Sequence, residues 1–262
     1  MAKYVLRGIA FFYLAFLLVI PLGVILRRTF QHGLEPVWHS LTTHEALHAF
    51  QVTIFVSLWV VVLNTVFGIT AAILIVRHEF PGKRVFNALI DLPLAVSPVV
   101  VGLALILVYG RLTPVGRWFG DHGVNIIFAL PGMVLATAFV SLPLMVREVA
   151  PVLEEVGIEQ EQAAWTLGAS ARETFRRVTL PSIRWAAAYG IVLTLARSLG
   201  EFGAVAVVSG RVLGKTQTIT LFVQERYENF DATSAYAASF ALAAIAVIVL
   251  LLMNLLRPKE PA

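Results

Sequence analysis

Long apolar runs recur along this chain, and they constrain its fold more than any other feature. A hydrocarbon core about 30 Å thick is bridged by a helix of about 20 apolar residues. The runs of suitable length predict six membrane spans, near residues 8–26, 52–76, 86–109, 126–146, 183–208 and 235–256. Because unpaired backbone groups are costly in lipid, each span must be helical. The predicted fold class is therefore an all-α integral membrane protein.

The composition excludes a soluble fold of this length. Hydrophobic residues make up 58% of the 262 residues and charged residues only 14%, so the apolar surface exceeds what a soluble core buries. The net charge of +4 does not indicate nucleic-acid binding, because Lys and Arg fall in short clusters between the apolar runs. The chain has no cysteine, which excludes disulfides, thiolate zinc sites and thiol catalysis.

The charge clusters predict how the spans are oriented. The first apolar run follows Lys3 and Arg7, is longer than the apolar region of a signal peptide and lacks an evident cleavage site, so we interpret it as a retained span. Six spans put both termini on one side. Of the 20 Lys and Arg residues, 12 lie on that side, 7 on the other, and Arg197 within a span. This bias predicts a multi-pass protein with both termini in the cytoplasm.

The histidines predict neither a metal centre nor a hydrolase. His44 and His48 have the i, i+4 spacing of metal ligands, but no third ligand is evident, and solvated loop histidines are the commoner case. All six histidines fall between the predicted spans, so none lies at membrane depth to act as a base. We assign no catalytic residue and no metal ligand.

The longest polar stretch, residues 147–184, predicts two short helices between the fourth and fifth spans. Gly157 and Gly168 bracket the first helix, and Gly168 is placed just beyond its C-terminus. The apolar and small residues of this helix form a stripe, Ile158, Ala163, Ala164 and Leu167. The remaining positions are polar, Glu159, Gln160, Glu161 and Gln162.

The second helix of this stretch is predicted from a capping box. Ser170 precedes Glu173 by three residues, so a helix is expected to start at Ala171. Pro181 then suits the first turn of the fifth span. From these patterns alone, the stretch is equally well a capped surface hairpin or a helix that docks into a partner's groove.

A spaced motif in this loop resembles the EAA loop of ABC-importer permeases. The matching residues are Glu161, Gln162, Ala163, Ala164, Gly168, Val178, Leu180 and Pro181. Gln162 stands where the motif has Glu, and Val178 replaces Ile. The resemblance implies that the coupling loop, residues 147–182, docks into an ABC ATPase dimer in the cytoplasm, mainly through Ala163, Ala164 and Gly168. The chain has no phosphate-binding Gly-rich loop, so ATP and Mg are expected on the ATPase, with no cofactor in this chain.

Three further stretches, residues 91–102, 196–210 and 214–218, are similar to the W-type permease subunits of sulfate/thiosulfate importers. The resemblance implies a type I ABC-importer permease fold in a bacterial inner membrane, a T-type sister permease and an external sulfate-binding protein. It divides the chain into an N-terminal span with an external segment (1–51), the permease core (52–256) and a cytoplasmic tail (257–262). A molybdate or tungstate permease, which usually pairs with itself, is the alternative, and the choice between sulfate and thiosulfate stays open.

Six residues are candidates for the transport pathway or its gate: Ser97, Pro98, Arg197, Gly200, Glu201 and Gly203. Pro93 and Pro98 interrupt the third apolar run and predict a kink, and a broken helix can line a pathway. Arg197 and Glu201 lie one helical turn apart in the fifth predicted span, where neither charge should face lipid. They form either a mutually neutralising structural pair or an anion-attracting residue beside a gate.

Overall fold

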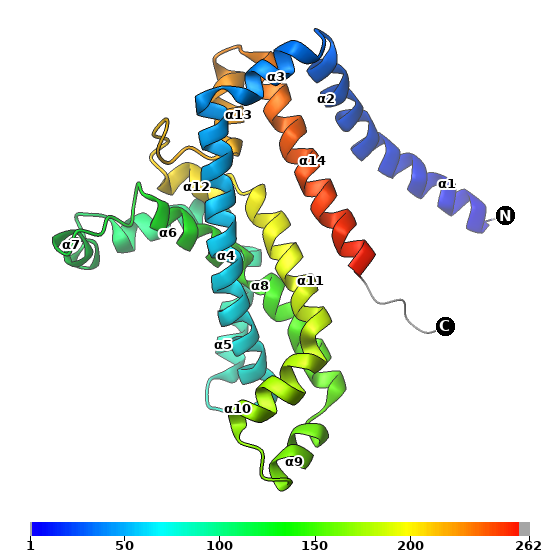
Figure 1. The fold of residues 1–262 in the computed structure, drawn as a ribbon, viewed down its shortest axis with the longest axis vertical. Coiled ribbons are helices and arrows are strands. Elements are labelled where there is room, and N and C mark those ends of the chain that lie inside the picture. Colours follow the sequence, from blue (N-terminus) through cyan, green and yellow to red (C-terminus); the bar gives the residue numbers. More distant parts are fainter. Residues whose placement is uncertain (1, 257–262) are drawn as a thin grey trace.

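The computed structural model describes residues 2–256, so the predicted tail 257–262 lies outside the described residues, and the regular structure within that range is helical (Figure 1). The α-helices are α1 (Ala2–Leu14), α2 (Ile20–Phe30), α3 (Leu34–Thr42), α4 (His44–Arg77), α5 (Lys83–Ala95), α6 (Pro98–Tyr109), α7 (Pro114–Asp121), α8 (Leu130–Val156), α9 (Glu159–Thr166), α10 (Ala171–Thr174), α11 (Leu180–Leu199), α12 (Gly203–Val208), α13 (Ile219–Glu228) and α14 (Ala232–Leu256). Two π-helical turns, η1 (Ala15–Val19) and η2 (Phe175–Thr179), join α1 to α2 and α10 to α11.

Within residues 2–256, five helices are long and apolar enough to cross a membrane, and a bent pair makes a sixth span. The five are Tyr4–Phe30, His44–Arg77, Leu130–Val156, Ala171–Leu199 and Ala232–Leu251. The bent pair, α5 and α6, forms one span broken by an angle of 116°. The six-span, all-helical prediction is therefore confirmed when the bent pair is counted once. The second span begins at His44, eight residues earlier than predicted.

The third predicted span, residues 86–109, is not the kinked helix we expected. Val96 and Ser97 have extended backbones, with ψ near +135°, and the chain turns sharply there. Proline disfavours helical geometry in the residue before it, and Pro98 imposes this on Ser97. Pro93 lies inside α5 without ending it. As a result α6 leaves the bundle sideways and carries α7 with it (Figure 1).

The fifth predicted span, residues 183–208, ends nine residues early. α11 stops at Leu199, and α12 begins only at Gly203. Gly200 is the C-cap of α11. Glycine destabilises a helix more than any other residue except proline. Glu201 therefore lies in the break between two helices rather than within a span.

At its other end the same helix is longer than predicted. Residues Ala171–Leu199 form one continuous helix, so the second loop helix is the beginning of the fifth span. Pro181 lies in the first turn of α11, as predicted, but the longer helix has already begun at Ala171. The π-turn η2 precedes Pro181, in which the Leu180 N–H donates to the Phe175 carbonyl, and the widened turn accommodates a proline that has no N–H to donate.

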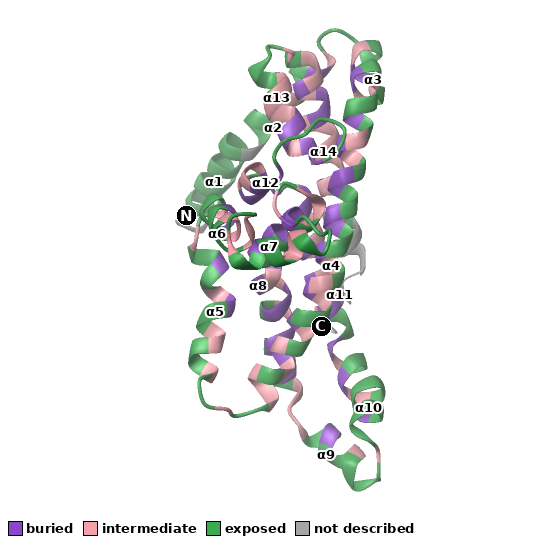
Figure 2. Cartoon of the chain, turned by 90° about the vertical axis from the view of Figure 1, so that its left-hand side faces the viewer, coloured by how far each residue is buried: buried purple, intermediate pink, exposed green. Residues whose placement is uncertain are grey.

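The helices α4, α8 and α11 pack together as the centre of the bundle. Buried residues follow these helices along the length of the molecule (Figure 2). A Cβ on Gly68 of α4 would lie 2.5 Å from the Met145 side chain of α8, and one on Gly190 of α11 would lie 2.7 Å from the Met145 sulfur. Small residues at such crossings let membrane helices approach closely.

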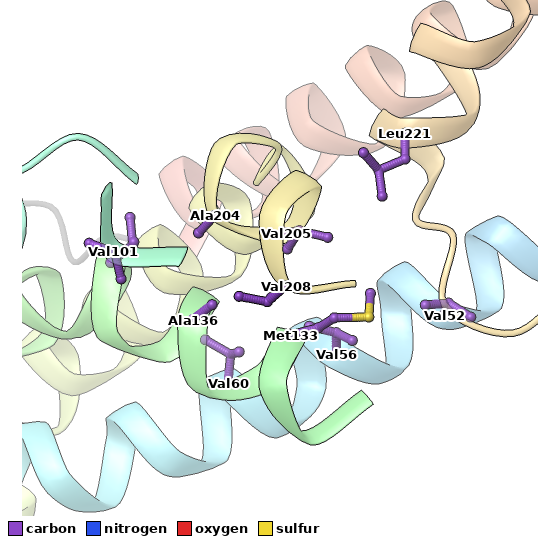
Figure 3. Packing of buried hydrophobic residues seen from close by; sticks show 11 residues of the cluster. Val52, Val56, Val60, Val101, Met133, Ala136, Ala204, Val205, Val208 and Leu221 are labelled. Atoms are coloured by element: carbon purple, nitrogen blue, oxygen red, sulfur yellow. The ribbon is translucent and has the colours of Figure 1, made fainter. Parts of the chain in front are cut away.

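A second buried cluster joins the broken helices to this centre. It includes Val56 and Val60 of α4, Met133 of α8, and Val205 and Val208 of α12 (Figure 3). Val101 joins α6 to this cluster, and Leu221 adds α13 to it. The break after Leu199 therefore lies against the core and is not a free loop.

The first span stands apart from the bundle (Figure 1). None of its most apolar window is buried. Its α2 end contacts α14, where the Thr29 hydroxyl donates to the Tyr236 carbonyl at 3.1 Å and Phe30 packs edge-on against Phe240. In the single chain the rest of this span faces outward.

Candidate functional site

The predicted coupling loop forms a compact hairpin at one end of the molecule, called here the α9 end (Figure 1). Gly168 follows the C-cap Leu167 with φ +85°, as predicted. Its N–H donates to the Trp165 carbonyl at 3.0 Å, and the Ala169 N–H donates to the Ala164 carbonyl at 3.0 Å. These two bonds make a Schellman motif, which fixes the end of α9.

The predicted capping box at the start of α10 is confirmed. The Ser170 hydroxyl accepts from the Glu173 N–H, and the Glu173 carboxylate accepts from the Ser170 N–H at 3.0 Å. Local bonds thus close the turn between α9 and α10 on both sides, so α9 and α10 form a defined hairpin rather than a floppy linker.

Glu161 corrects the predicted division of α9 into polar and apolar faces. The sequence placed it among the polar residues of this helix without separating it from them, and it is the buried residue of α9. Its carboxylate accepts from Arg77 Nε at 3.2 Å and from the Thr179 hydroxyl at 2.9 Å. A buried carboxylate needs such partners, because an unpaired buried charge is strongly destabilising.

Arg77 extends this contact to a third helix. At the C-terminus of α4, its Nη1 donates to the Leu153 carbonyl at 2.9 Å and its Nη2 to the Gly157 carbonyl at 2.6 Å. These are carbonyls of the last turn of α8 and of the residue after it, where helices leave acceptors unsatisfied. No local sequence pattern indicated Arg77, which is 84 residues from Glu161.

The outer surface of α9 presents small and apolar residues. Gln162, Ala163 and Gly168 are exposed, and Ala164 is half-buried. Trp165 and Leu167 are exposed as well, Leu167 by 88%. The sequence analysis did not single out Trp165 and expected Leu167 in a stripe with Ile158. Leu180 and Pro181 lie exposed at the start of α11, and Val178 is half-buried beside them.

The second candidate site is the break between α11 and α12, where the predicted pairing of Arg197 and Glu201 is present. Arg197 Nη1 lies 2.7 Å from Glu201 Oε2. The other carboxylate oxygen of Glu201 accepts from the Ala204 N–H at 2.9 Å, which caps the start of α12. The Glu201 side chain is 2% exposed and that of Arg197 is 39% exposed, so only the arginine reaches the surface of the chain.

The remaining pathway candidates divide into two groups. A Cβ on Gly203 would lie 3.0 Å from Pro98 Cβ, so the structure brings these two residues together where α6 and α12 begin. Ser97 and Gly200 are exposed, and nothing lies within 4 Å of a Cβ placed on Gly200. Gly102, which the sequence analysis did not select as a site residue, lets α6 approach Val207 of α12.

A further ion pair, which no sequence pattern predicted, links α8 to α5 with both side chains partly exposed. Arg147 of α8 donates through Nε to Asp91 of α5 at 2.9 Å, and its Nη2 reaches Asn87 at 3.3 Å. The available signal was an aspartate within a predicted span. The two predicted loop histidines His44 and His48 stack with ring centroids 6.4 Å apart, and in residues 2–256 they do not join a group of three potential metal ligands.

Comparison with known proteins gives consistent matches. The family model of binding-protein-dependent transport system inner membrane components matches residues 64–260. The sulfate transport system permease protein CysW of Synechocystis sp. is 47% identical over 257 residues, covering 98% of this chain and 93% of that protein. The sulfate transport system permease protein CysT of Synechocystis sp. is 37% identical over 245 residues, covering 94% of this chain and 86% of that protein.

The fold is also found among solved structures. A chain of the bacterial alginate ABC transporter, crystallised with an alginate pentasaccharide-bound periplasmic protein, aligns with a TM-score of 0.79 at 16% identity. The alignment covers 97% of this chain and 92% of that chain. The alignment confirms the predicted ABC-importer permease fold.

Proposed function

The chain belongs to the family of binding-protein-dependent transport system inner membrane components, and we propose that it is one of two permease subunits of an importer that uses ATP to bring sulfate or thiosulfate into the cell. Family membership makes it a multi-pass permease of the inner membrane and not an ATPase. The proposed substrate follows the similarity to the sulfate transport system permease protein CysW.

The outward face of α9 is the observation that carries the coupling role. Ala163 is exposed and nothing lies within 4 Å of a Cβ placed on Gly168. Trp165 and Leu167 add apolar surface at the tip of an otherwise polar hairpin. A short helix with small residues outward fits deep in a groove of a partner. We propose that the partner is a dimer of ABC ATPases that binds ATP and Mg, and that the α9 end is cytoplasmic, with both termini on the same side.

The exposed first span supports a second permease subunit. Its apolar surface is left open by this chain, and the similarity to the permease protein CysT identifies a related type of subunit that pairs with a CysW-like one in our proposal. The other expected component is an external sulfate-binding protein at the end of the molecule formed by α3 and α13 (Figure 1).

Sulfate chemistry explains the use of ATP. Moving a dianion into a cell held 100 mV negative inside requires about 4.6 kcal/mol before any concentration gradient is considered. A passive pore would therefore drain sulfate outward. In our proposal the broken spans near Pro98 and Gly203 line the pathway, with Arg197 as its exposed cation and the buried Glu201 as the residue that holds it.

The decisive experiment replaces Ala163 by Glu in the assembled transporter. We expect the variant to reach the membrane but to lose most ATPase co-purification and sulfate uptake, because a charged side chain cannot enter an apolar groove without a partner. Ala232→Glu is the matched control for ATPase co-purification, since Ala232 is also exposed but begins α14 at the end opposite the proposed ATPase. Normal ATPase binding and uptake in Ala163→Glu would rule out the coupling role, and uptake of molybdate but not sulfate by the unaltered complex would favour the rival substrate.

A further inference from the structure

We propose that Arg77, Glu161 and Thr179 act as a clamp that makes α9 move as one body with the ends of α4, α8 and α11. They are positioning residues for the coupling step, and the inference rests on the proposed function of α9. The clamp would convert a displacement of one short helix into a displacement of three spans at once.

The bonds of Arg77 and Glu161 connect four separate segments. Arg77 belongs to α4 and holds the Leu153 and Gly157 carbonyls at the end of α8. Glu161 belongs to α9 and receives Nε and Nη2 of Arg77, at 3.2 and 3.4 Å. Thr179, in the π-turn that leads into α11, donates its hydroxyl to the same carboxylate at 2.9 Å. Both oxygens of Glu161 are therefore engaged inside the chain.

Little else holds α9 in place. The helix has eight residues, too few to be stable alone in water. Gly157 and Gly168 flank it with φ of +70° and +85°, and the bonds that close the Gly168 turn join α9 to α10 and not to α4 or α8. Glu161 is its buried residue, whereas its apolar side chains Trp165 and the neighbouring Leu167 point outward. The polar clamp thus replaces the apolar packing that normally fixes a helix to its support.

The neighbouring residue has the opposite orientation. Gln162 is exposed, although it occupies the position where the EAA motif has its glutamate. The Glu161 carboxylate has its partners inside the chain and holds the loop to the spans. Because Glu161 is buried and Gln162 is exposed, Glu161 transmits the movement of α9 to the spans, and the outer face of α9 remains available for docking to the ATPase.

The test compares uptake per ATP hydrolysed in assembled complexes of Thr179→Val and Glu161→Gln. Coupling free energies between protein sites correspond to about 5- to 150-fold, so we expect sulfate carried per ATP to fall roughly tenfold while hydrolysis continues. Thr179→Ser keeps the hydroxyl and should retain the wild-type ratio. Glu79→Gln is the matched control, because Glu79 pairs with Lys83 close to Arg77 but its side chain is 89% exposed.

A substrate-independent measurement separates this inference from the proposed function. The chain has no cysteine, so Gln160→Cys on α9 accepts a single spin label. We expect the label to become more mobile in Thr179→Val and Glu161→Gln but not in Thr179→Ser or Glu79→Gln. Unchanged mobility in Thr179→Val would overturn the clamp, even if Glu161→Gln failed to assemble. A wild-type complex that binds no ATPase or carries no sulfate would instead overturn the proposed function, and the mobility result would still decide the clamp.

Discussion

At the scale of single residues, the two candidate sites use the same device, a carboxylate buried beside an arginine. Glu161 is held by Arg77 and a hydroxyl, and Glu201 by Arg197 and the N–H of Ala204. The pairs differ in exposure. Arg77 is enclosed, whereas Arg197 is 39% exposed and can turn to another anion. The first pair therefore suits a fixed joint and the second a contact that can open.

This asymmetry predicts unequal effects of neutralising Arg197 and Glu201. Arg197→Gln strands a buried carboxylate and should destabilise the assembled complex by about 3 to 5 kcal/mol. Glu201→Gln should be milder, because an amide oxygen can still accept from Ala204 and the exposed arginine remains solvated. The measurement is a double-mutant cycle on thermal unfolding in detergent, with sulfate uptake measured in parallel. Additive losses without coupling between the two positions would show that each charge has another partner.

At the scale of elements, glycine positions decide how closely the spans pack. Met145 of α8 lies between Gly68 of α4 and Gly190 of α11, so the three central helices meet at one side chain. The backbone breaks also have local causes. Pro98 disfavours helical geometry at Ser97, which separates α5 from α6, and Gly200 ends α11. Packing and breaks together place α6 and α12 side by side at the pathway candidates.

We expect Gly68→Ala to loosen this three-helix contact. The new Cβ would lie 2.5 Å from Met145 Cγ, so Met145 must shift, and overpacking of this kind destabilises by about 1 to 3 kcal/mol. Gly120→Ala in α7 is the control, because nothing lies within 4 Å of its Cβ, and it should be neutral or slightly stabilising. The thermal midpoint of the purified complex reports both. Met145 Cβ would also lie 2.7 Å from the new Cβ, so Met145→Gly is the change that removes both close contacts. A Gly68→Ala loss of the same size with and without Met145→Gly would contradict the packing argument.

At the scale of the whole molecule, what could be predicted from the sequence depended on the distance between the interacting residues. The apolar runs predicted six spans, and the capping box at Ser170 and the glycine after α9 were correct because each is decided within a few residues. The 116° bend was underestimated, since a proline indicates a break but not its angle. The Arg77–Glu161 contact could not be predicted, because helix packing brings together residues 84 positions apart.

The two ends of the molecule also differ in charge, which leads to a prediction of its orientation. Basic residues gather on the elements of the α9 end, Lys83, Arg84, Arg172, Arg176, Arg177 and Arg184. Positively charged segments are retained in the cytoplasm when membrane proteins insert, so we expect this end to be cytoplasmic and the α3 end to face outward.

Single cysteines in the cysteine-free chain test this orientation. Leu34→Cys lies at the exposed start of α3, and Gln160→Cys lies on exposed α9. We expect an impermeant maleimide added to spheroplasts to label Leu34→Cys alone, and to label both variants once the membrane is permeabilised. Neither residue lies in a membrane span or in the clamp, and labelling with and without the co-expressed ATPase separates the side of the membrane from burial of α9 by its partner. Labelling of Gln160→Cys in intact spheroplasts would place α9 outside, where no ATPase could reach it. That result would contradict both the predicted orientation and the coupling role of α9.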